Sequence, residues 1–236
     1  PTLGTVSRNE NGYPIGYFFG YKAIGVFQTQ EEIDSYISPA TGKPIQPNAA
    51  PGDTKFEDLN GDGVISDDNE DRTMIGKPNP DWMVGLTVAA DWNGFDLSAF
   101  FQGSFGADVF DALRRYELAA VNYTSDALER WTGPGTSNSM PRIVLGDTPK
   151  NFRPSTLLVH DASFLRLRNL QVGYTLPAQL TRKAYIQRLR FYASFDNLLT
   201  ITGYKGMDPE IGSTMGIDKG VYPQARVYTF GLNLTF

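Results

Sequence analysis

The last nine residues of the chain, Tyr228–Phe236, alternate strictly between apolar side chains and polar or small ones. The apolar set consists of Tyr228, Phe230, Leu232, Leu234 and Phe236. A period of two places each set on its own face of a β-strand. A transmembrane barrel strand has this pattern because one face meets lipid and the other a polar lumen, over about ten residues. A soluble sandwich strand can also alternate, so the pattern favours a membrane strand without excluding a sandwich.

Four upstream segments repeat the alternation: 82–92, 95–102, 169–176 and 188–196. Asn93 and Gly94 separate the first two and form a strong signal for a tight hairpin. Trp92 and Phe95 should then pair on the apolar face. The polar set includes Arg190, which would be costly in a soluble core but not in a watery lumen. The sequence therefore predicts an antiparallel transmembrane β-barrel segment of about five spanning strands.

The alternation assigns side chains to two environments. We expect these residues to face lipid: Trp82, Leu86, Trp92, Phe95, Phe101, Tyr174, Phe191, Phe195, Phe230 and Leu232. We expect these to face the lumen: Asp91, Asp96, Gln102, Gln171, Arg190, Asp196 and Asn233. Arg166 and Arg168 share the Leu170 side of their strand, so we expect a carboxylate or a lipid headgroup to satisfy them at its extracellular end.

The connections between these strands alternate in length. Short ones join the first strand to the second and the third to the fourth, and long ones join the second to the third and the fourth to the fifth. This predicts periplasmic turns, extracellular loops and a periplasmic C-terminus. Five strands would leave two open edges, which lipid does not tolerate, so we expect the chain to be part of a larger barrel. We expect residues 1–80 to form an extracellular loop region and residues 81–236 to form the C-terminal transmembrane strands and loops.

Shorter elements are predicted outside these strands. Residues 17–27 read as an extracellular hairpin, 30–36 as a short helix and 38–53 as a loop. Residues 107–121 have helical composition, and 125–131 form a second helical candidate capped by Thr124 or Ser125.

The clearest chemical motif is a calcium-type loop. Asp58, Asn60 and Asp62 stand at positions 1, 3 and 5 of an EF-hand pattern, with Gly63 at position 6. The carbonyl of Val64 would be the ligand at position 7. Asn69 occupies position 12, so a two-residue insertion would let Asp71 supply the last carboxylate. The alternative is a solvated acidic turn held by its own Asx hydrogen bonds.

Composition excludes several functions. A net charge of −5 leaves no basic surface for nucleic acid. The chain has no cysteine and a single histidine, His160, so disulfides, thiolate metal sites and histidine pairs cannot form. Asp208 and Glu210 flank Pro209, but neighbouring acids of one loop seldom oppose each other across a sugar. We therefore expect no catalytic residues and no enzyme activity.

A series of motifs covers nearly the whole chain: residues 20–28, 58–65, 71–80, 100–106, 161–170, 173–177, 196–198, 204–210, 216–223 and the last strand. The order of these motifs carries a resemblance to SusC-type (RagA-like) TonB-dependent transporters. It implies an outer-membrane importer of glycans or peptides, with a barrel of about 22 strands and an internal plug. It also implies two partners, a SusD-like surface lipoprotein and TonB. The chain contains no plug and no TonB box, so we expect it to be the C-terminal barrel portion.

Two hypotheses from other classes remain. The chain could be a calcium-stabilised, secreted β-sandwich that binds glycans, in which case it would dissolve without detergent. A calcium-dependent hydrolase is the other, but no nucleophile and base are brought together by any motif. Tyr116, Tyr123 and Trp131 could stack on a glycan, although packing within their own loop is the simpler interpretation.

Overall fold

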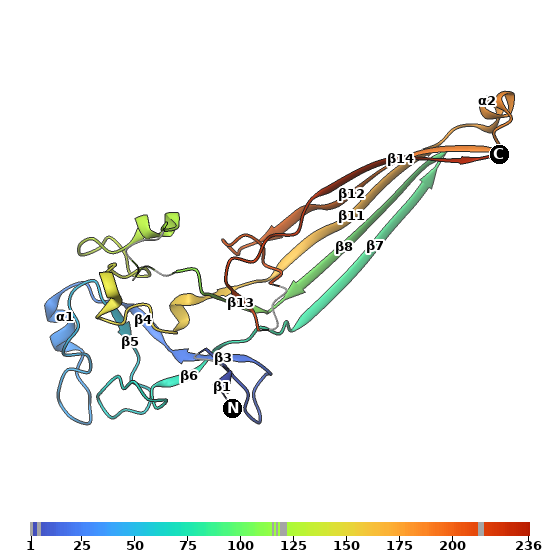
Figure 1. The fold of residues 1–236 in the computed structure, drawn as a ribbon. Coiled ribbons are helices and arrows are strands. Elements are labelled where there is room, and N and C mark those ends of the chain that lie inside the picture. Colours follow the sequence, from blue (N-terminus) through green and yellow to red (C-terminus); the bar gives the residue numbers. More distant parts are fainter. Residues whose placement is uncertain (1, 4–5, 115, 117, 119–121, 212–214) are drawn as a thin grey trace. The chain divides into compact units, whose positions relative to one another are not determined.

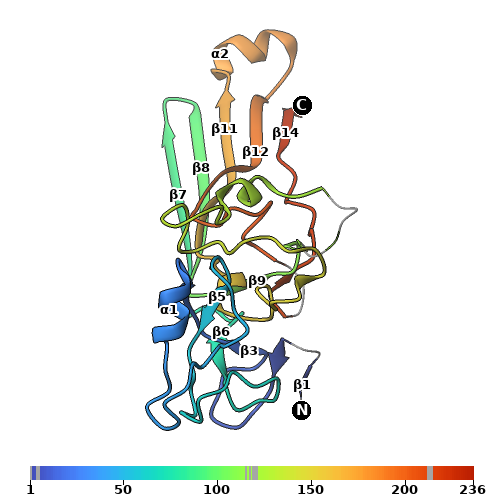
Figure 2. The same cartoon turned by 90° about the vertical axis from the view of Figure 1, so that its left-hand side faces the viewer.

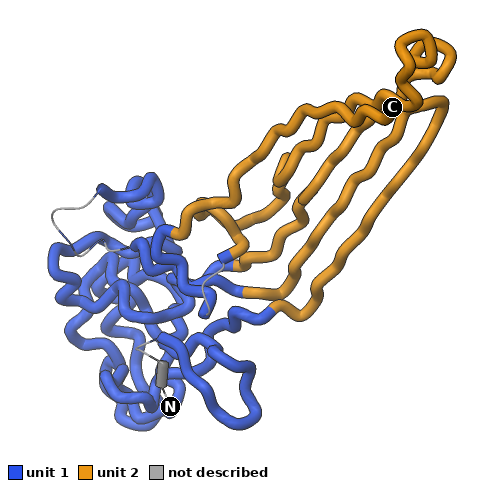
Figure 3. The backbone as a smooth tube through the Cα atoms, turned by 45° about the vertical axis from the view of Figure 1, so that its right-hand side comes forward, with its two compact units in different colours: residues 1–79, 108–160, 211–220 blue, residues 80–107, 161–210, 221–236 orange. Residues whose placement is uncertain are grey.

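The structure is a computed structural model, and it describes all residues except 1, 4–5, 115, 117, 119–121 and 212–214. The chain forms two compact units (Figure 3). Unit 1 contains residues 1–79, 108–160 and 211–220, and unit 2 contains residues 80–107, 161–210 and 221–236. The sequence grouped residues 108–160 and 211–220 with the strands, whereas here they cluster with residues 1–79. In the described parts of the chain, no helix is both long enough and apolar enough to cross a membrane.

Unit 2 is built on one antiparallel sheet with the strand order β14-β12-β11-β8-β7 (Figure 1). Its strands are β7 (Trp82–Trp92), β8 (Phe95–Phe105), β11 (Phe164–Thr175), β12 (Arg188–Thr202) and β14 (Val227–Thr235). The five predicted strands are confirmed. The third starts five residues earlier than predicted, at Phe164, and the fourth continues to Thr202. Both extensions alternate as well, but a register shift between Leu167 and Asn169 puts their alternation out of phase with the rest of each strand.

The β7–β8 hairpin closes on two residues with left-handed backbone conformations. The φ angles are +49° at Asn93 and +86° at Gly94, as a type I′ turn requires. Trp92 pairs with Phe95, and the register continues without a break to Trp82 and Phe105. The predicted hairpin and its register are therefore confirmed.

A β-bulge interrupts the alternation of β11. Arg166 pairs with Gln102 of β8, but Asn169 pairs with Phe100, so Arg168 is an extra residue relative to β8. The pairing with β12 shifts at the same place, beside Asn197, whose φ is +52°. A bulge exchanges the faces on either side of it. Arg166 thus shares a face with Gln102, and its predicted placement on the Leu170 side was wrong.

Two short elements join β11 and β12 at the turn end of the sheet: α2 (Ala178–Thr181) and the 3-10 helix η4 (Arg182–Ala184). Both lie beyond the strand ends, at the same end of unit 2 as the C-terminus (Figure 2). The amide of Leu176 donates to Leu189 at 2.9 Å, and the amide of Gln187 donates to Thr235 at 2.8 Å. These bonds fix both ends of the turn to the strands.

Unit 1 contains short strands in three sheets. One has the order β1-β2-β3-β6, one pairs β4 with β5, and one has the order β10-β9-β13. The strands are β1 (Thr2–Leu3), β2 (Ser7–Arg8), β3 (Tyr17–Tyr21), β4 (Ala23–Val26), β5 (Thr54–Phe56), β6 (Arg72–Gly76), β9 (Asp108–Asp111), β10 (Val159–Asp161) and β13 (Ile217–Asp218). The helices are α1 (Gln30–Ser35) and the 3-10 helices η1 (Ser125–Glu129), η2 (Leu145–Asp147) and η3 (Thr156–Leu158).

The core of unit 1 forms around buried side chains of β3, β9 and η3, namely Phe18, Phe110 and Leu158. The prediction of a helix over 107–121 is wrong where β9 forms, because Phe110 pairs with Ile217 and fills this core. Residues 115, 117 and 119–121 of that prediction lie outside the described residues. The helix predicted at 30–36 is present, with Thr29 accepting from the Glu32 amide as its N-cap.

Candidate functional site

The five-stranded sheet has one apolar face. Rows of paired residues cross it, such as the row in which Phe95, Tyr174, Phe191 and Leu232 are successive partners. Large aromatic side chains on this face are exposed, for example Trp82 at 73% and Phe230 at 75%. Every residue predicted to face lipid lies on this face by the register. A soluble surface rarely exposes so large an apolar area.

The opposite face is polar. Glycines on it leave room for side chains of the neighbouring strands to lie flat against the sheet. Arg190 donates from Nε to Asp96 at 2.9 Å, and this pair crosses directly over Gly173. A Cβ on Gly173 would lie 2.5 Å from both partners. The Tyr192 ring lies over Gly231 in the same way, where a Cβ would be 2.6 Å from the ring. The residues predicted to face the lumen lie on this face by the register.

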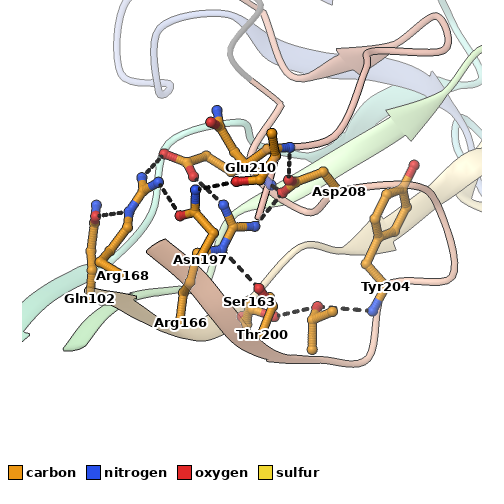
Figure 4. Close-up of polar contacts among 12 residues, drawn as sticks. Gln102, Ser163, Arg166, Arg168, Asn197, Thr200, Tyr204, Asp208 and Glu210 are labelled. Carbon is orange, nitrogen blue, oxygen red and sulfur yellow. Dashed lines mark hydrogen bonds and ion pairs between the residues drawn. The ribbon is translucent and has the colours of Figure 1, made fainter. Parts of the chain in front are cut away.

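A network of arginines and carboxylates lies at the loop end of the sheet (Figure 4). Arg166, only 2% exposed, donates to Asp208 at 2.6 Å and to Glu210 at 2.9 Å. Arg168 donates to Glu210 at 2.5 Å and to Gln102 at 2.7 Å. The bulge aims both arginines at one loop, which follows β12. Of the two expected partners for these arginines, a carboxylate or a lipid headgroup, the structure shows the carboxylate.

Two backbone amides complete the environment of Asp208. The amides of Gln224 and Glu210 each donate to its carboxylate at 2.9 Å. Burial alone would raise the pKa of Asp208, but these amides and the Arg166 guanidinium together hold the pKa below its usual value. Asp208 is therefore ionised near neutral pH and joins both ends of the loop to β11. Its two oxygens are occupied, so Asp208 and Glu210 form a structural anchor instead of a pair of catalytic acids.

The calcium-type loop forms a tight turn stabilised by its own side chains. Both carboxylate oxygens of Asp58 accept amides, from Gly61 and Gly63, at 2.8 Å. Asn60 accepts from the Asp62 amide at 3.0 Å, and Asp62 accepts from the Val64 amide at 2.8 Å. Gly63 has a φ of +90°. These are the Asx bonds of the acidic-turn alternative, although carboxylate oxygens have further lone pairs for a cation.

Asp71 is fully buried and closes this loop. One of its oxygens accepts from the Leu59 amide at 3.2 Å, and the other accepts from the Ser66 amide at 2.8 Å. The donor set is the oxygen-rich one that calcium prefers. Across the residues that the structure describes, however, no three His, Cys, Asp or Glu side chains gather around a possible metal position. The sequence missed the role of Asp71 as a clamp between the two ends of the turn.

The aromatic residues of the long loop pack within unit 1. The Trp131 ring lies against Gly52 and its indole nitrogen donates to Gln28 at 3.1 Å. Tyr116 is 1% exposed and meets Tyr123 edge to face. His160 lies 3.8 Å from the Asp111 carboxylate. Packing, the simpler interpretation, is confirmed for Trp131 and Tyr116.

Comparison with known proteins gives matches over nearly the whole chain. No protein-family model matches. A TonB-dependent receptor P3 of Formosa agariphila is 34% identical, over 95% of this chain and 22% of its own length. The TonB-dependent receptor SusC of Bacteroides thetaiotaomicron is 30% identical, over 98% of this chain and 21% of its own length. The solved RagAB peptide transporter has a chain that is 28% identical, with a TM-score of 0.72, over 99% of this chain and 24% of that one. This chain thus spans between a fifth and a quarter of the length of these relatives.

Proposed function

The chain belongs to the SusC/RagA-type TonB-dependent transporters and is a segment of such a protein. We propose that this segment forms part of the barrel wall and of the extracellular loops of an outer-membrane importer. The observation that carries the proposal is the two-faced sheet. Its apolar face suits lipid, and its polar face, with the Asp96–Arg190 pair lying flat over glycine, suits an open lumen. The secreted β-sandwich is disfavoured, since the relatives are receptors and importers.

The orientation follows from the connections. The tight β7–β8 turn and the compact 176–187 turn would lie in the periplasm together with the C-terminus, and unit 1 would lie outside the cell. The chain has no cysteine, so single cysteines report cleanly on this arrangement. In the full-length receptor with no other exposed cysteine, an impermeant maleimide should label Thr132→Cys on intact cells. Gln179→Cys should react only after the outer membrane is permeabilised, and the reverse pattern would overturn the orientation.

The partners and cargo are proposals by analogy with the relatives. A SusD-like surface lipoprotein would meet the extracellular loops, and TonB would act through parts of the receptor outside this segment. Affinity purification of the full-length receptor in mild detergent should recover the lipoprotein in stoichiometric amount. The cargo would be a peptide or a glycan, and the similar RagAB protein is a peptide transporter.

We also propose that calcium binds the 58–71 loop as a structural ion. Asp58, Asn60, Asp62 and Asp71 would supply side-chain oxygens and Val64 its carbonyl. The ion would replace or share the Asx bonds and order the loop ahead of β6. Its support is the donor spacing and the sharp turn at Gly63.

A further inference from the structure

The lipid-side face of the sheet contains an apolar hollow near the turn end. Its volume is about 360 Å³. The residues that line it are Phe95, Val172, Gly173, Tyr174, Phe191, Tyr192, Ala193, Phe230 and Gly231. Phe95 and Tyr174 pack with ring centres 4.4 Å apart. Four aromatic side chains and the smaller Val172 and Ala193 thus line an apolar depression whose volume suits part of a hydrocarbon chain.

A cationic turn lies immediately beyond this hollow. Tyr174 and Phe191 pair across β11 and β12, and the 176–187 turn joins the ends of these same strands. The segment 176–189 contains Arg182, Lys183 and Arg188 and no acidic residue, although the whole chain has a net charge of −5. Arg182 and Lys183 are exposed, and neither is engaged in an ion pair within the described residues. Their charge is thus available to an external anion.

The same turn has the features of a membrane-interface segment. Leu180 is 60% exposed and Tyr185 is 91% exposed, beside the two cations. Exposed tyrosine with neighbouring lysine and arginine is the composition found at the level of lipid headgroups. The amide of Leu176 and that of Gln187 bond to the strand ends, so the turn is held at the end of the strands that line the hollow.

We propose that this hollow and the turn together form a binding site for one anionic phospholipid. An acyl chain lies between the aromatic walls on Val172 and Ala193, and the phosphate of the headgroup meets Arg182 and Lys183. Arg188 lies on the polar face of the sheet, paired with Thr235, and takes no part. The proposal rests on the proposed function, because only a membrane barrel presents this face to lipid. With the turn on the periplasmic side, the lipid comes from the inner leaflet of the outer membrane.

The test uses the full-length receptor, delipidated in detergent and reloaded from mixed micelles with equal amounts of phosphatidylglycerol and phosphatidylethanolamine. Native mass spectrometry counts the retained lipids. We expect one phosphatidylglycerol to be retained in preference. Each surface cation strengthens the binding of anionic lipid roughly fivefold. The double variant Arg182→Gln/Lys183→Gln should therefore retain phosphatidylglycerol more than tenfold less than the parent receptor.

Matched controls separate local from general effects. The double variant Lys205→Gln/Arg226→Gln removes the same charge from exposed residues at the loop end of the sheet and should retain the lipid. Ala193→Phe fills the hollow and should lower retention. Ala90→Phe adds the same ring to the apolar face of β7, outside the hollow, and should not.

Equal retention of the two lipids would show only ordinary surrounding lipid and would overturn the proposal. Undiminished phosphatidylglycerol retention in either the cation variant or Ala193→Phe would do the same. Heat-dependent gel mobility shows that each variant is folded. Failure of the proposed function is a different result, in which the parent receptor is not recovered from outer membranes at all.

Discussion

Leu232 and Asn233 are adjacent in β14, yet the register places them on opposite faces. Leu232 pairs with Phe191 on the apolar face, and Asn233 pairs with Arg190 on the polar one. A lysine in place of Leu232, near the middle of the strand, would bring a charge into hydrocarbon and should destabilise the barrel by about 2–4 kcal/mol. Asn233→Lys should be mild because its side chain is in water. Denaturant unfolding in detergent or lipid measures both, and equal losses would contradict the assigned faces.

Asp208 gives a residue-scale prediction about pH. Its pKa is depressed in the folded state, mainly because backbone amides and Arg166 outweigh the effect of burial. The stabilisation is therefore complete above the ordinary carboxyl pKa of about 3.9 and is lost as pH falls through the lower folded pKa. The hydrogen-exchange protection of residues 203–226, measured relative to the intrinsic rate at each pH, should be unchanged between neutral and mildly acidic pH and should fall only in stronger acid.

The variant Asp208→Asn provides the control for this prediction. It removes the charge, so the loop should exchange faster at neutral pH and should lose the contribution of Asp208 to the acid response. An exchange rate at neutral pH like that of the parent would show that the ion pair does not anchor the loop.

Among the elements, the 58–71 loop makes the calcium proposal testable. Asp62→Ala should abolish calcium binding and loosen this loop, while the β7–β14 sheet remains folded because its ladders lie elsewhere. Calorimetric titration of the full-length receptor measures binding, and limited proteolysis reports on the loop. Asp68→Ala is the matched control, since Asp68 is an exposed acid of the same segment outside the proposed ligand set. A parent receptor that shows no binding in millimolar calcium would leave the acidic turn as the explanation.

At the scale of the whole molecule, the apolar face decides between a membrane protein and a secreted one. Trp82, Trp92 and Phe230 are each more than 70% exposed in the isolated chain. If they face lipid, the full-length receptor should stay in the membrane pellet after alkaline carbonate extraction and dissolve only with detergent. A secreted β-sandwich would be released into the carbonate supernatant. Periplasmic and integral outer-membrane marker proteins analysed in the same extraction calibrate the result.

The sequence by itself determined the spanning strands and the faces of most of their residues. Strand alternation is local, and the Asn93–Gly94 turn fixes the register of β7 and β8 through backbone conformation alone. Periodicity is therefore readable without knowing which strands are neighbours. The donor spacing of the 58–71 loop was equally local, although whether a cation occupies it stays a prediction.

The tertiary structure decided what depends on contacts between distant segments. The bulge at Arg168 exchanges faces because the pairing of β11 with β8 and with β12 shifts register there. The apolar residues of β11 change from Leu165 and Leu167 to Leu170 and Val172 at this place, but the pairing shows that one strand continues through the change. Asp208 and Glu210 became anchors because Arg166 lies more than forty residues earlier, across the end of the sheet. Residues 108–111 form a strand instead of a helix because Phe110 pairs with Ile217 of β13 and its side chain packs against Phe18 of β3 in the core. In each case the energy comes from pairing and burial between segments, which outweigh the local preference of the residues themselves.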